Sequence, residues 1–399
     1  MLGRRINVQY RQFGKLGFRV SALGFGAMRL PTVNGKIDEA QAIRMLHHAI
    51  DTGVNYVDTA YTYHGGESER VVGKALRGGY REKVKVATKL PCWEVKTAAD
   101  FDRLLDEQLA RLSMDSIDVY LLHSLNKDSW PRMRDLGVLA WAETAMAKGK
   151  FRHLGFSFHD SLDVFTTIID AYDWPLCQIQ YNFMDPDFQA GVQGLRYAAS
   201  KGTAVVIMEP LMGGKLVSSP AHVQRLWDTA GVHRTPVDWA LRWLWNQPEV
   251  SVVLSGMSSM EQTIEDVALA ASPQLGELSV AEKALYEKVR ASYSKLAVIP
   301  CTACGYCMPC PHGVDIPANL GTYNEGVVFD TPAASRGQYG WWKHSYEVLH
   351  IQDHDIRAVR CEQCRECDDK CPQGIPVSRW MPVIDSVLGA GKPWVMKLE

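Results

Sequence analysis

Eight of the ten cysteines in this 399-residue chain lie in two short runs between residues 301 and 371. In each run, three cysteines are separated by two residues, and a fourth follows that directly precedes a proline. The first run holds Cys301, Cys304, Cys307 and Cys310, and the second holds Cys361, Cys364, Cys367 and Cys371. Thiolates at this spacing allow one short loop to surround an iron–sulfur cube, so the runs predict two 4Fe-4S clusters and single-electron transfer.

The second run has the spacing C-x2-C-x2-C-x3-C-P of two-cluster bacterial ferredoxins, in which the fourth cysteine ligates the other cluster. The first run has one residue fewer before Cys310. We therefore expect Cys371 to complete the cluster of the first run and Cys310 to complete the cluster of the second. Structural zinc is the alternative, although four-cysteine zinc sites usually consist of two separated C-x2-C pairs.

The composition argues against several kinds of partner. A formal net charge of −2 gives no electrostatic signature for binding nucleic acid or an anionic membrane. No apolar stretch is long enough to predict a membrane span, and Met1 to Ile6 lack the apolar segment of a secretory signal. These features predict a protein without nucleic-acid or membrane partners. Because iron–sulfur clusters need reduced thiolates, we also expect it to be cytoplasmic.

A regular alternation of strand-like and helix-like segments precedes the cysteines. The expected strands are residues 21–25, 56–59, 84–89, 118–123, 153–157, 177–181, 204–209 and 250–255, and the clearest helices are 39–51, 68–76, 99–112 and 236–246. This alternation favours an α/β fold, a closed (β/α)8 TIM barrel with a parallel sheet. We place the barrel in residues 1–295 and a ferredoxin-like iron–sulfur module in residues 296–399.

Other segments add to this plan. Residues 10–18 predict a short hairpin that closes the bottom of the barrel, and residues 279–295 predict one further amphipathic helix. The stretch between the two cysteine runs is rich in Gly, Pro, Tyr and Trp, and its pattern assigns no element.

Chemistry in such a barrel gathers where the strands end at its C-terminal face. Asp58 ends the second strand, Tyr63 lies in the loop after it, Lys89 ends the third strand and His123 ends the fourth. A lysine ending an apolar strand is costly to bury alone, so a carboxylate partner is expected, and Asp58 on the neighbouring strand can reach it. Taken singly, Asp58–Lys89 also fits a structural ion pair, and His123 fits a core histidine.

These residues carry a resemblance to a known family. The segment from Asp58 to Tyr63, followed by Gly66-Glu-Ser-Glu69 and Gly73, resembles the signature of the aldo-keto reductases, and Lys89, His123 and Gly155-Phe-Ser157 follow in that family's order. The likeness covers residues 8–270. With the cysteine runs added, the chain resembles aldo-keto reductase-like proteins that bear a C-terminal 4Fe-4S dicluster domain.

The resemblance implies reduction of a small-molecule carbonyl, or oxidation of the alcohol, with Tyr63 as general acid and base. A tyrosine ordinarily titrates near 10, and the Lys89 ammonium is expected to lower that pKa. Asp58 would hold Lys89 charged and oriented, and His123 would orient or polarise the carbonyl.

The resemblance also implies nucleotide contacts. Ser157 and Gln178 match the residues that hold the nicotinamide carboxamide, and Met208 stands where an aromatic side chain usually stacks on the ring. The asparagine expected after the serine is Phe158 here, with His159 as a candidate replacement. The other implied contacts come from two loops, one with Pro210, Leu211 and Gly213 and one with Gly256, Ser258, Gln262 and Asp266.

The second of these loops has no lysine or arginine where a 2′-phosphate would bind, and Gln262 stands at the usual arginine position. A 2′-phosphate normally pairs with a cation. Both NADP(H) and NAD(H) therefore stay open as the cofactor, with Lys215 as a candidate cation from another loop. A flavin has no sequence signature but also stays open, because hydride carries two electrons and a cluster accepts one.

The two cysteines outside the runs, Cys92 and Cys177, are expected to be small buried hydrophobes. Cys177 precedes Gln178 on one strand and should face the helices. Cys92 and Trp93 follow Lys89 closely, which leaves a place in the substrate pocket open.

Together these features predict an iron–sulfur oxidoreductase of the aldo-keto reductase type with two clusters. Its substrate would be a small carbonyl or alcohol, and a ferredoxin- or flavodoxin-like carrier is a candidate partner. The alternative is a non-catalytic nucleotide-binding protein for electron transfer or redox sensing. The four strand-end residues favour the enzyme, whereas Phe158, Met208 and the uncharged phosphate loop favour the alternative.

Overall fold

The computed structural model describes residues 8–271, 277–347 and 353–398, and the chain divides into two compact units. One unit comprises Met1–Gly213 and Val237–Leu278, and the other comprises Gly214–Pro236 and Ser279–Glu399. Met1 to Ile6, considered above for a secretory signal, lie outside the described residues. None of the described helices combines the length and the apolar character needed to cross a membrane.

The first unit contains the closed barrel of eight strands that the alternation predicted. The strands are parallel and follow one another around the barrel in chain order. They are β3 (Leu23–Gly26), β6 (Tyr56–Asp58), β7 (Lys85–Leu90), β8 (Ile117–Leu125), β9 (Phe151–Phe158), β10 (Leu176–Gln180), β11 (Ala204–Met208) and β12 (Val250–Ser255).

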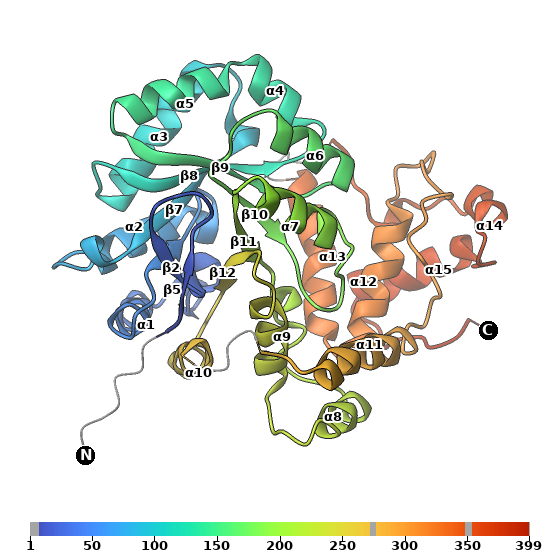
Figure 1. The fold of residues 1–399 in the computed structure, drawn as a ribbon. Helices are drawn as coiled ribbons and strands as arrows, with labels where there is room; N and C mark the ends of the chain where they lie inside the picture. The colour runs from blue at the N-terminus through green and yellow to red at the C-terminus, as the bar shows by residue number, and fades with distance from the viewer. Residues whose placement is uncertain (1–7, 272–276, 348–352, 399) are drawn as a thin grey trace. The chain divides into compact units, whose positions relative to one another are not determined.

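Helices surround these strands (Figure 1). They are α1 (Glu39–Asp51), α2 (Glu67–Ala75), α3 (Ala99–Leu112), α4 (Ser129–Asp135), α5 (Val138–Ala147), α6 (Leu162–Asp170), α7 (Gly191–Ser200), α9 (Pro236–Trp245) and α10 (Met260–Ala270). The apolar stripes of the amphipathic helices pack on the outer side chains of the strands, which forms the larger core of this unit.

Alternation along the strands decides which side chains point into the barrel. Interior residues such as Tyr56, Ala87 and Leu121 pack with one another, whereas their chain neighbours pack against the helices. Side chains two positions further along these strands point the same way, and at these positions stand Asp58, Lys89 and His123. The strand phase therefore directs three predicted site residues to the inside of the barrel mouth.

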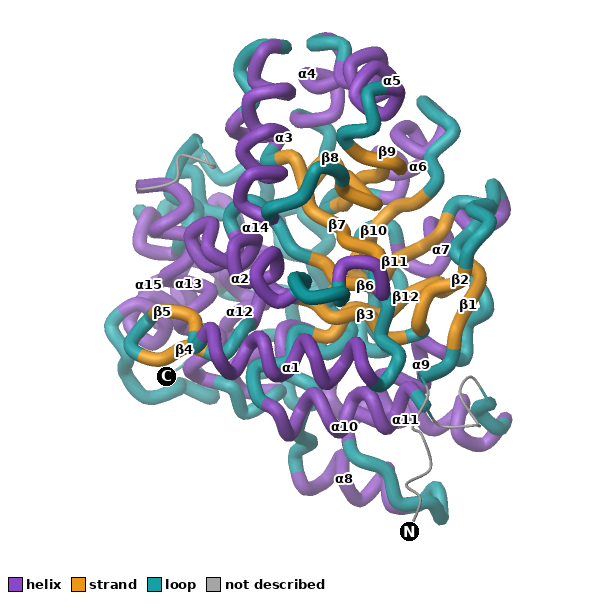
Figure 2. The backbone as a smooth tube through the Cα atoms, turned by 90° about the vertical axis from the view of Figure 1, so that its left-hand side faces the viewer, coloured by secondary structure: helices purple, strands orange, loops and turns teal. Residues whose placement is uncertain are grey.

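The predicted N-terminal hairpin is present as β1 (Tyr10–Gln12) and β2 (Arg19–Ser21), which pair antiparallel (Figure 2). Phe13 in its turn is fully buried and belongs to the interior cluster, with its ring centroid 5.6 Å from that of Tyr56. The hairpin thus closes the barrel at the end opposite the strand C-termini. A second small hairpin pairs β4 (Thr32–Val33) with β5 (Lys36–Ile37).

The regular elements described in the second unit are helices, and the cysteine runs lie largely in loops between them. It contains α8 (Ala221–Asp228), α11 (Val280–Ser294), α12 (Ile316–Val328), α13 (Pro332–Glu347), α14 (Glu366–Lys370) and α15 (Val377–Ile384). The predicted helix at 279–295 is confirmed as α11, which begins with a capping box of Ser279 and Glu282. Trp227 of α8 packs edge-on against Tyr286 of α11, with centroids 5.2 Å apart.

Helices α12 and α13 occupy the stretch that the sequence pattern left unassigned. Glycines inside this stretch lower its helix propensity and interrupt the helical repeat of apolar side chains. At Gly326 the glycine has a packing role, because a Cβ there would lie 2.3 Å from a ring carbon of Trp394. Asp315 caps the start of α12 by accepting a hydrogen bond from the backbone N–H of Ala318.

Candidate active site and cysteine sites

The four predicted site residues, three on strands and Tyr63 in a loop, meet at the C-terminal mouth of the barrel. The Lys89 ammonium donates to Asp58 Oδ1 at 2.7 Å, to the Thr59 carbonyl at 2.8 Å and to the Tyr63 hydroxyl at 3.3 Å. The rings of Tyr63 and His123 lie edge to face with centroids 6.2 Å apart. The structure thus brings all four side chains together around the end of the Lys89 side chain.

The turn after Tyr63 explains how a loop residue reaches this group. His64, Gly65 and Gly66 have φ values of 52°, 65° and 93°, so three consecutive residues are left-handed. Glycine adopts this conformation without steric cost, whereas a residue with a side chain is strained in it. The turn reverses the chain directly behind Tyr63 and leads into α2.

Lys89 and Asp58 form a buried ion pair, with only 0% and 2% of their surfaces exposed. Burial lowers the pKa of Lys89, but Asp58 and the Tyr63 hydroxyl outweigh this effect, so the net pKa is raised and the ammonium persists at neutral pH. Removing either partner of such a pair is strongly destabilising, because it leaves the other charge buried without compensation.

The acidity of Tyr63 differs from the expectation. Burial raises the pKa of Tyr63 above its ordinary value, and the Lys89 ammonium lowers it only in part. The predicted effect of Lys89 is present, but desolvation is larger because the phenolate would be taken out of water. At neutral pH Tyr63 is therefore a protonated phenol, which suits a proton donor.

His123 is a neutral imidazole at this site. Burial, followed by the charges of Lys89 and His159, holds the pKa of His123 well below its usual value. Its Nδ1 is buried and finds no hydrogen-bond partner among the described residues. Trp93 lies beside it, with ring centroids 5.0 Å apart, so Trp93 borders the space in front of His123.

The predicted carboxamide-binding residues lie at the ends of β9 and β10. Ser157 Oγ accepts a hydrogen bond from the backbone N–H of Ser124 at 2.8 Å, which leaves its hydroxyl proton available. Gln178 Nε2 lies 3.7 Å from the sulfur of Met208, while its buried Oε1 has no partner within the described part of the chain. An unpaired buried acceptor beside a hydroxyl donor fits an amide ligand, which presents an N–H group and a carbonyl.

Phe158 and His159 separate in space. Phe158 is fully buried among the outer core residues, so its side chain does not face the mouth. His159 lies near His123 and shares a 3.3 Å hydrogen bond between its Nδ1 and Gln189 Nε2. Of the two, His159 is the one placed beside the site.

The predicted phosphate loops follow β11 and β12, and Pro210, Leu211 and Gly213 lie in the first. In the second, which begins at Gly256, Gln262 Oε1 accepts hydrogen bonds from the backbone N–H and the hydroxyl of Ser258, at 2.8 and 3.2 Å. Asp266 is buried behind this loop, where burial raises its pKa to about 7 and Ser255 partly opposes the shift.

Arg29 is a cation that the sequence reasoning missed. Its side chain lies across the two glycines of these loops: a Cβ on Gly256 would be 3.3 Å from Arg29 Cδ, and one on Gly213 would be 3.3 Å from Arg29 Nη2. Arg29 follows β3 within a 3-10 turn (Ala27–Arg29), so its position just beyond a barrel strand was the available signal. Lys215, the cation considered from the sequence, is instead paired with Glu325 at 2.5 Å in the second unit.

The first cysteine run and Cys371 surround one cavity. Its wall includes Cys301, Cys304, Cys307 and Cys371, together with apolar residues of α12 and of the start of α15. Burial raises the pKa of Cys301, and the nearby sulfurs of Cys304 and Cys371 raise it further. The structure therefore gathers the four sulfurs expected for one cluster, including the one from the second run.

The second run has a local backbone like that of the first. Ala303 and Gln363 have φ values of 54° and 53°, and each donates its backbone N–H to the sulfur two residues earlier, Cys301 or Cys361, at 3.4 Å. After burial, the sulfurs of Cys310 and Cys364 raise the pKa of Cys361, so these three lie near one another. Burial, then Asp368, raises the pKa of Cys367 to about 12, and Cys361 adds to that effect.

In residues 8–271, 277–347 and 353–398, no three His, Cys, Asp or Glu side chains are arranged to hold one metal ion.

Cys92 and Cys177 are both buried in the core between strands and helices. Burial raises the pKa of the Cys92 thiol to about 12, and it also raises that of Cys177. Both are therefore buried thiols, as expected from the sequence, and Trp93 is the residue whose ring lies beside His123.

A buried lysine contacts a carboxylate and a tyrosine at the mouth of a closed parallel barrel, an arrangement that fits a barrel oxidoreductase. The chain belongs to the aldo/keto reductase family, whose model matches residues 22–282. A model of the 4Fe-4S dicluster domain matches residues 300–376. The chain is thus an enzyme of that family with a C-terminal iron–sulfur domain. The first match supports a nicotinamide cofactor, and the second supports an iron–sulfur cofactor.

Individual relatives agree with this assignment. L-galactose dehydrogenase of Arabidopsis thaliana is 30% identical over 305 residues, which span 70% of this chain and 93% of that protein. Probable aldo-keto reductase 1 of Glycine max is 27% identical over 300 residues, or 66% of this chain and 85% of that protein. Among solved structures, the holo form of aldo-keto reductase AKR11C1 from Bacillus halodurans matches with a TM-score of 0.60 and 25% identity, covering 71% of this chain and 96% of that chain.

Proposed function

We propose that the barrel reduces a small-molecule carbonyl, or oxidises the corresponding alcohol, at Tyr63, Lys89, Asp58 and His123, and that the C-terminal part exchanges single electrons through two 4Fe-4S clusters. In this proposal residues 1–295 form the reductase part and residues 296–399 the iron–sulfur part. The observation that carries it is the contact of one buried ammonium, Lys89, with both Asp58 and the Tyr63 hydroxyl.

Each of the four residues has one role. A bound nicotinamide supplies or accepts the hydride. Tyr63 donates its proton to the oxygen of the carbonyl that is being reduced, and its raised pKa keeps that proton in place at neutral pH. Lys89 stabilises the phenolate that Tyr63 becomes, Asp58 keeps Lys89 charged, and neutral His123 orients the carbonyl through a hydrogen bond.

The nucleotide is proposed to lie along the mouth of the barrel. Ser157 and Gln178 would hold the carboxamide, and the loops of Pro210, Leu211 and Gly213 and of Gly256, Ser258, Gln262 and Asp266 would hold the phosphates and the adenosine. Arg29, which lies over Gly213 and Gly256, supplies a cation between these loops. Because the cation lies between the loops and Gln262 holds the usual arginine position, we expect similar affinity for NADH and NADPH.

Replacing the cation tests this part of the proposal. Arg29→Ala should weaken both NADH and NADPH by about 10–100-fold, the value of hydrogen bonds to a charged group. Calorimetric titration of each cofactor measures the change. If only NADPH were weakened, Arg29 would serve the 2′-phosphate and the expected similarity would be wrong.

The cysteines are proposed to hold two clusters with exchanged fourth ligands. Cys301, Cys304, Cys307 and Cys371 would hold one cluster, and Cys361, Cys364, Cys367 and Cys310 the other. Bound clusters supply or accept electrons one at a time, whereas hydride transfer moves two. A flavin, or a ferredoxin- or flavodoxin-like carrier in the cytoplasm, would reconcile the two, and flavin analysis of the purified protein separates these routes.

The second candidate function is a non-catalytic nucleotide-binding redox sensor. It is favoured by Phe158, which is buried away from the mouth, and by Met208, which replaces a stacking aromatic ring. It predicts nucleotide binding without turnover of any carbonyl.

One experiment decides between the two functions. The protein is purified without oxygen, its iron and sulfide are measured, and reduction of a panel of aldehydes and ketones is followed with NADH and NADPH. Tyr63→Phe should lower kcat by about 10²–10⁴-fold with unchanged iron and sulfide, since it removes the proton donor alone. Equal activity of the variant and the parent would refute the role of Tyr63, and binding without turnover in the parent would favour the sensor.

A further inference from the structure

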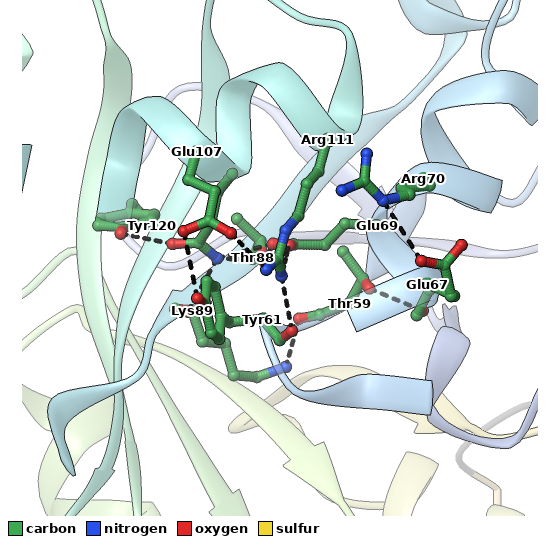
Figure 3. Close-up of polar contacts among 12 residues, drawn as sticks. Thr59, Tyr61, Glu67, Glu69, Arg70, Thr88, Lys89, Glu107, Arg111 and Tyr120 are labelled. Atoms are coloured by element: carbon green, nitrogen blue, oxygen red, sulfur yellow. Dashed lines mark hydrogen bonds and ion pairs between the residues drawn. The ribbon is translucent and has the colours of Figure 1, made fainter. Parts of the chain in front are cut away.

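Behind the four site residues lies a second polar group, here called the Glu69 cluster: Glu69, Thr88, Gln108, Arg111 and Tyr120. Figure 3 labels all of these residues except Gln108. Glu69 lies on α2, Gln108 and Arg111 on α3, and Thr88 and Tyr120 on strands β7 and β8. Glu69, Thr88, Gln108 and Tyr120 are each 0% exposed. The cluster therefore lies on the outer side of the strands, under the helices.

Glu69 is a buried carboxylate whose oxygens are satisfied by three donors. Thr88 Oγ1 and Gln108 Nε2 donate to Oε1 at 2.6 and 2.7 Å, and Arg111 Nη1 lies 3.3 Å from Oε2. Burial raises the pKa of Glu69, and these three donors oppose it. Replacing buried charges by apolar side chains is often neutral or stabilising in proteins, so the contacts that Glu69 orders are the feature to explain.

One side of the cluster fixes the strand end that carries Lys89. Gln108 Nε2 donates to the Lys89 carbonyl at 3.0 Å and to Thr88 Oγ1 at 3.1 Å. The Tyr120 hydroxyl donates to Gln108 Oε1 at 2.7 Å, which sets the orientation of the amide. The backbone of Lys89 is thus held by a side chain of α3 in addition to the sheet.

The other side fixes the loop that carries Tyr63. Arg111 Nη1 donates to the Tyr61 carbonyl at 3.0 Å, and the Arg111 guanidinium lies 4.0 Å from the centroid of the Tyr61 ring. Beyond Tyr63, a Cβ on Gly66 would lie 3.0 Å from Arg111 Nη1, so the loop packs directly on the guanidinium. Tyr63 is therefore held between two points of the loop that both contact Arg111.

We propose that the Glu69 cluster is a positioning device that sets the 3.3 Å separation between Lys89 Nζ and the Tyr63 hydroxyl, an inference that rests on the proposed roles of these two residues. Glu69 joins the two anchors, because it binds Thr88 and Gln108 through one oxygen and Arg111 through the other. The members of the cluster do not touch the reacting atoms.

The electrostatic consequence has a definite sign. The groups that act on Tyr63 are Lys89, which lowers its pKa, and Asp58 and Glu209, which raise it. If the cluster loosens, the ammonium and the phenol separate, the phenolate loses its nearest cation and the pKa of Tyr63 rises. A shift of the reacting groups by an ångström can also slow the chemical step strongly.

Glu69→Gln tests the proposal, because it keeps the shape but removes one of the two carboxylate charges that face Arg111, the other being that of Glu107. We expect kcat to fall about tenfold while KM and nicotinamide affinity stay within about twofold. A second readout does not depend on turnover: 3-fluorotyrosine is placed at position 63 and titrated by fluorine NMR. In the Glu69→Gln background the pKa of this phenol should rise, so that its proton-dissociation constant falls about threefold. The matched control is Glu67→Gln, the same substitution on α2 at a side chain that is 63% exposed, which should change neither.

The outcomes separate this proposal from the proposed function. A folded Glu69→Gln protein with an unchanged titration at position 63 and unchanged kcat would overturn the positioning role. Carbonyl reduction that survives Tyr63→Phe would instead overturn the proposed function, while the titration still decides whether the cluster sets the environment of Tyr63. If Glu69→Gln does not fold, Tyr120→Phe replaces it, since it frees the Gln108 amide at smaller cost, and the same two measurements decide.

Discussion

In the barrel, the four proposed site residues stand on neighbouring strands and one loop, and the charged pair Asp58 and Lys89 is buried. In the iron–sulfur domain, three of four sulfurs share one short loop, and Cys304 and Cys364 are exposed. Lys89 has three acceptors for its ammonium within 3.3 Å without any ligand. The barrel site is therefore assembled by the protein's own hydrogen bonds, whereas the cysteine sites bring together groups whose natural partner is a metal cluster.

The two cysteine loops differ from each other in charge. Between Cys301 and Cys310 the sequence has no charged residue, whereas the second run contains three basic and four acidic residues from Arg360 to Lys370. One of them, Asp368, accepts hydrogen bonds from the backbone and the hydroxyl of Ser378, at 2.8 and 2.6 Å. Similar local backbones thus carry different electrostatic surroundings.

The largest effect should come from removing ligands of the domain, and it tests the exchanged fourth cysteines. If Cys371 belongs to the cluster of the first run, the double variant Cys304→Ser/Cys371→Ser loses one cluster and keeps about half of its iron. The control, Cys364→Ser/Cys371→Ser, should lose both clusters. Iron and sulfide analysis with electron paramagnetic resonance measures the result, and the opposite pattern would show that each run binds its own cluster.

In the barrel the corresponding change is Lys89→Met, which leaves Asp58 buried without its partner. We expect the barrel to lose about 3–5 kcal/mol of unfolding free energy, the usual effect of breaking a buried pair. The double variant Asp58→Leu/Lys89→Met should recover most of this loss, since no buried charge remains. Denaturant unfolding measures both, and iron content should stay that of the parent. This prediction assumes that the barrel site and the cysteine sites form independently, and a loss of iron in Lys89→Met would contradict that assumption.

A smaller effect depends on pH. Because burial raises the pKa of Asp266 from 3.8 to about 7, the folded protein binds a proton more tightly than the unfolded chain. Stability from this group is present below pH 4 and is lost as the pH rises towards 7. Asp266→Asn should therefore be more stable than the parent by about 2–4 kcal/mol at pH 8 and equal to it at pH 4. Melting curves at the two pH values check this, and equal gains at both would mean that Asp266 is ionised throughout.

Much of the architecture followed from local patterns. β-Branched runs predicted the strands of the barrel within a few residues, and strand ends pointed to Asp58, Lys89 and His123. Helices α12 and α13 were not predicted, because residues such as Gly326 are required by contacts with side chains that are distant in the sequence. Such contacts leave no periodic pattern in the local sequence.

The parts of the site that sequence missed depend on packing between distant segments. Arg29 was missed because it meets Gly213 and Gly256 only after the barrel closes. The net direction of the pKa of Tyr63 depends on how completely the phenol is buried, which spacing does not reveal. Gln108 gave no signal because a polar residue on a helix is usually solvated, whereas here it is fully buried.

The cavity lined by Cys301, Cys304, Cys307 and Cys371 has a consequence for the order of events during synthesis. A nascent chain that has reached α13 carries three of these sulfurs and lacks the fourth. The wall is complete only after Cys371 has left the ribosome. Assembly of all four sulfurs of this cavity must therefore follow the synthesis of both cysteine runs.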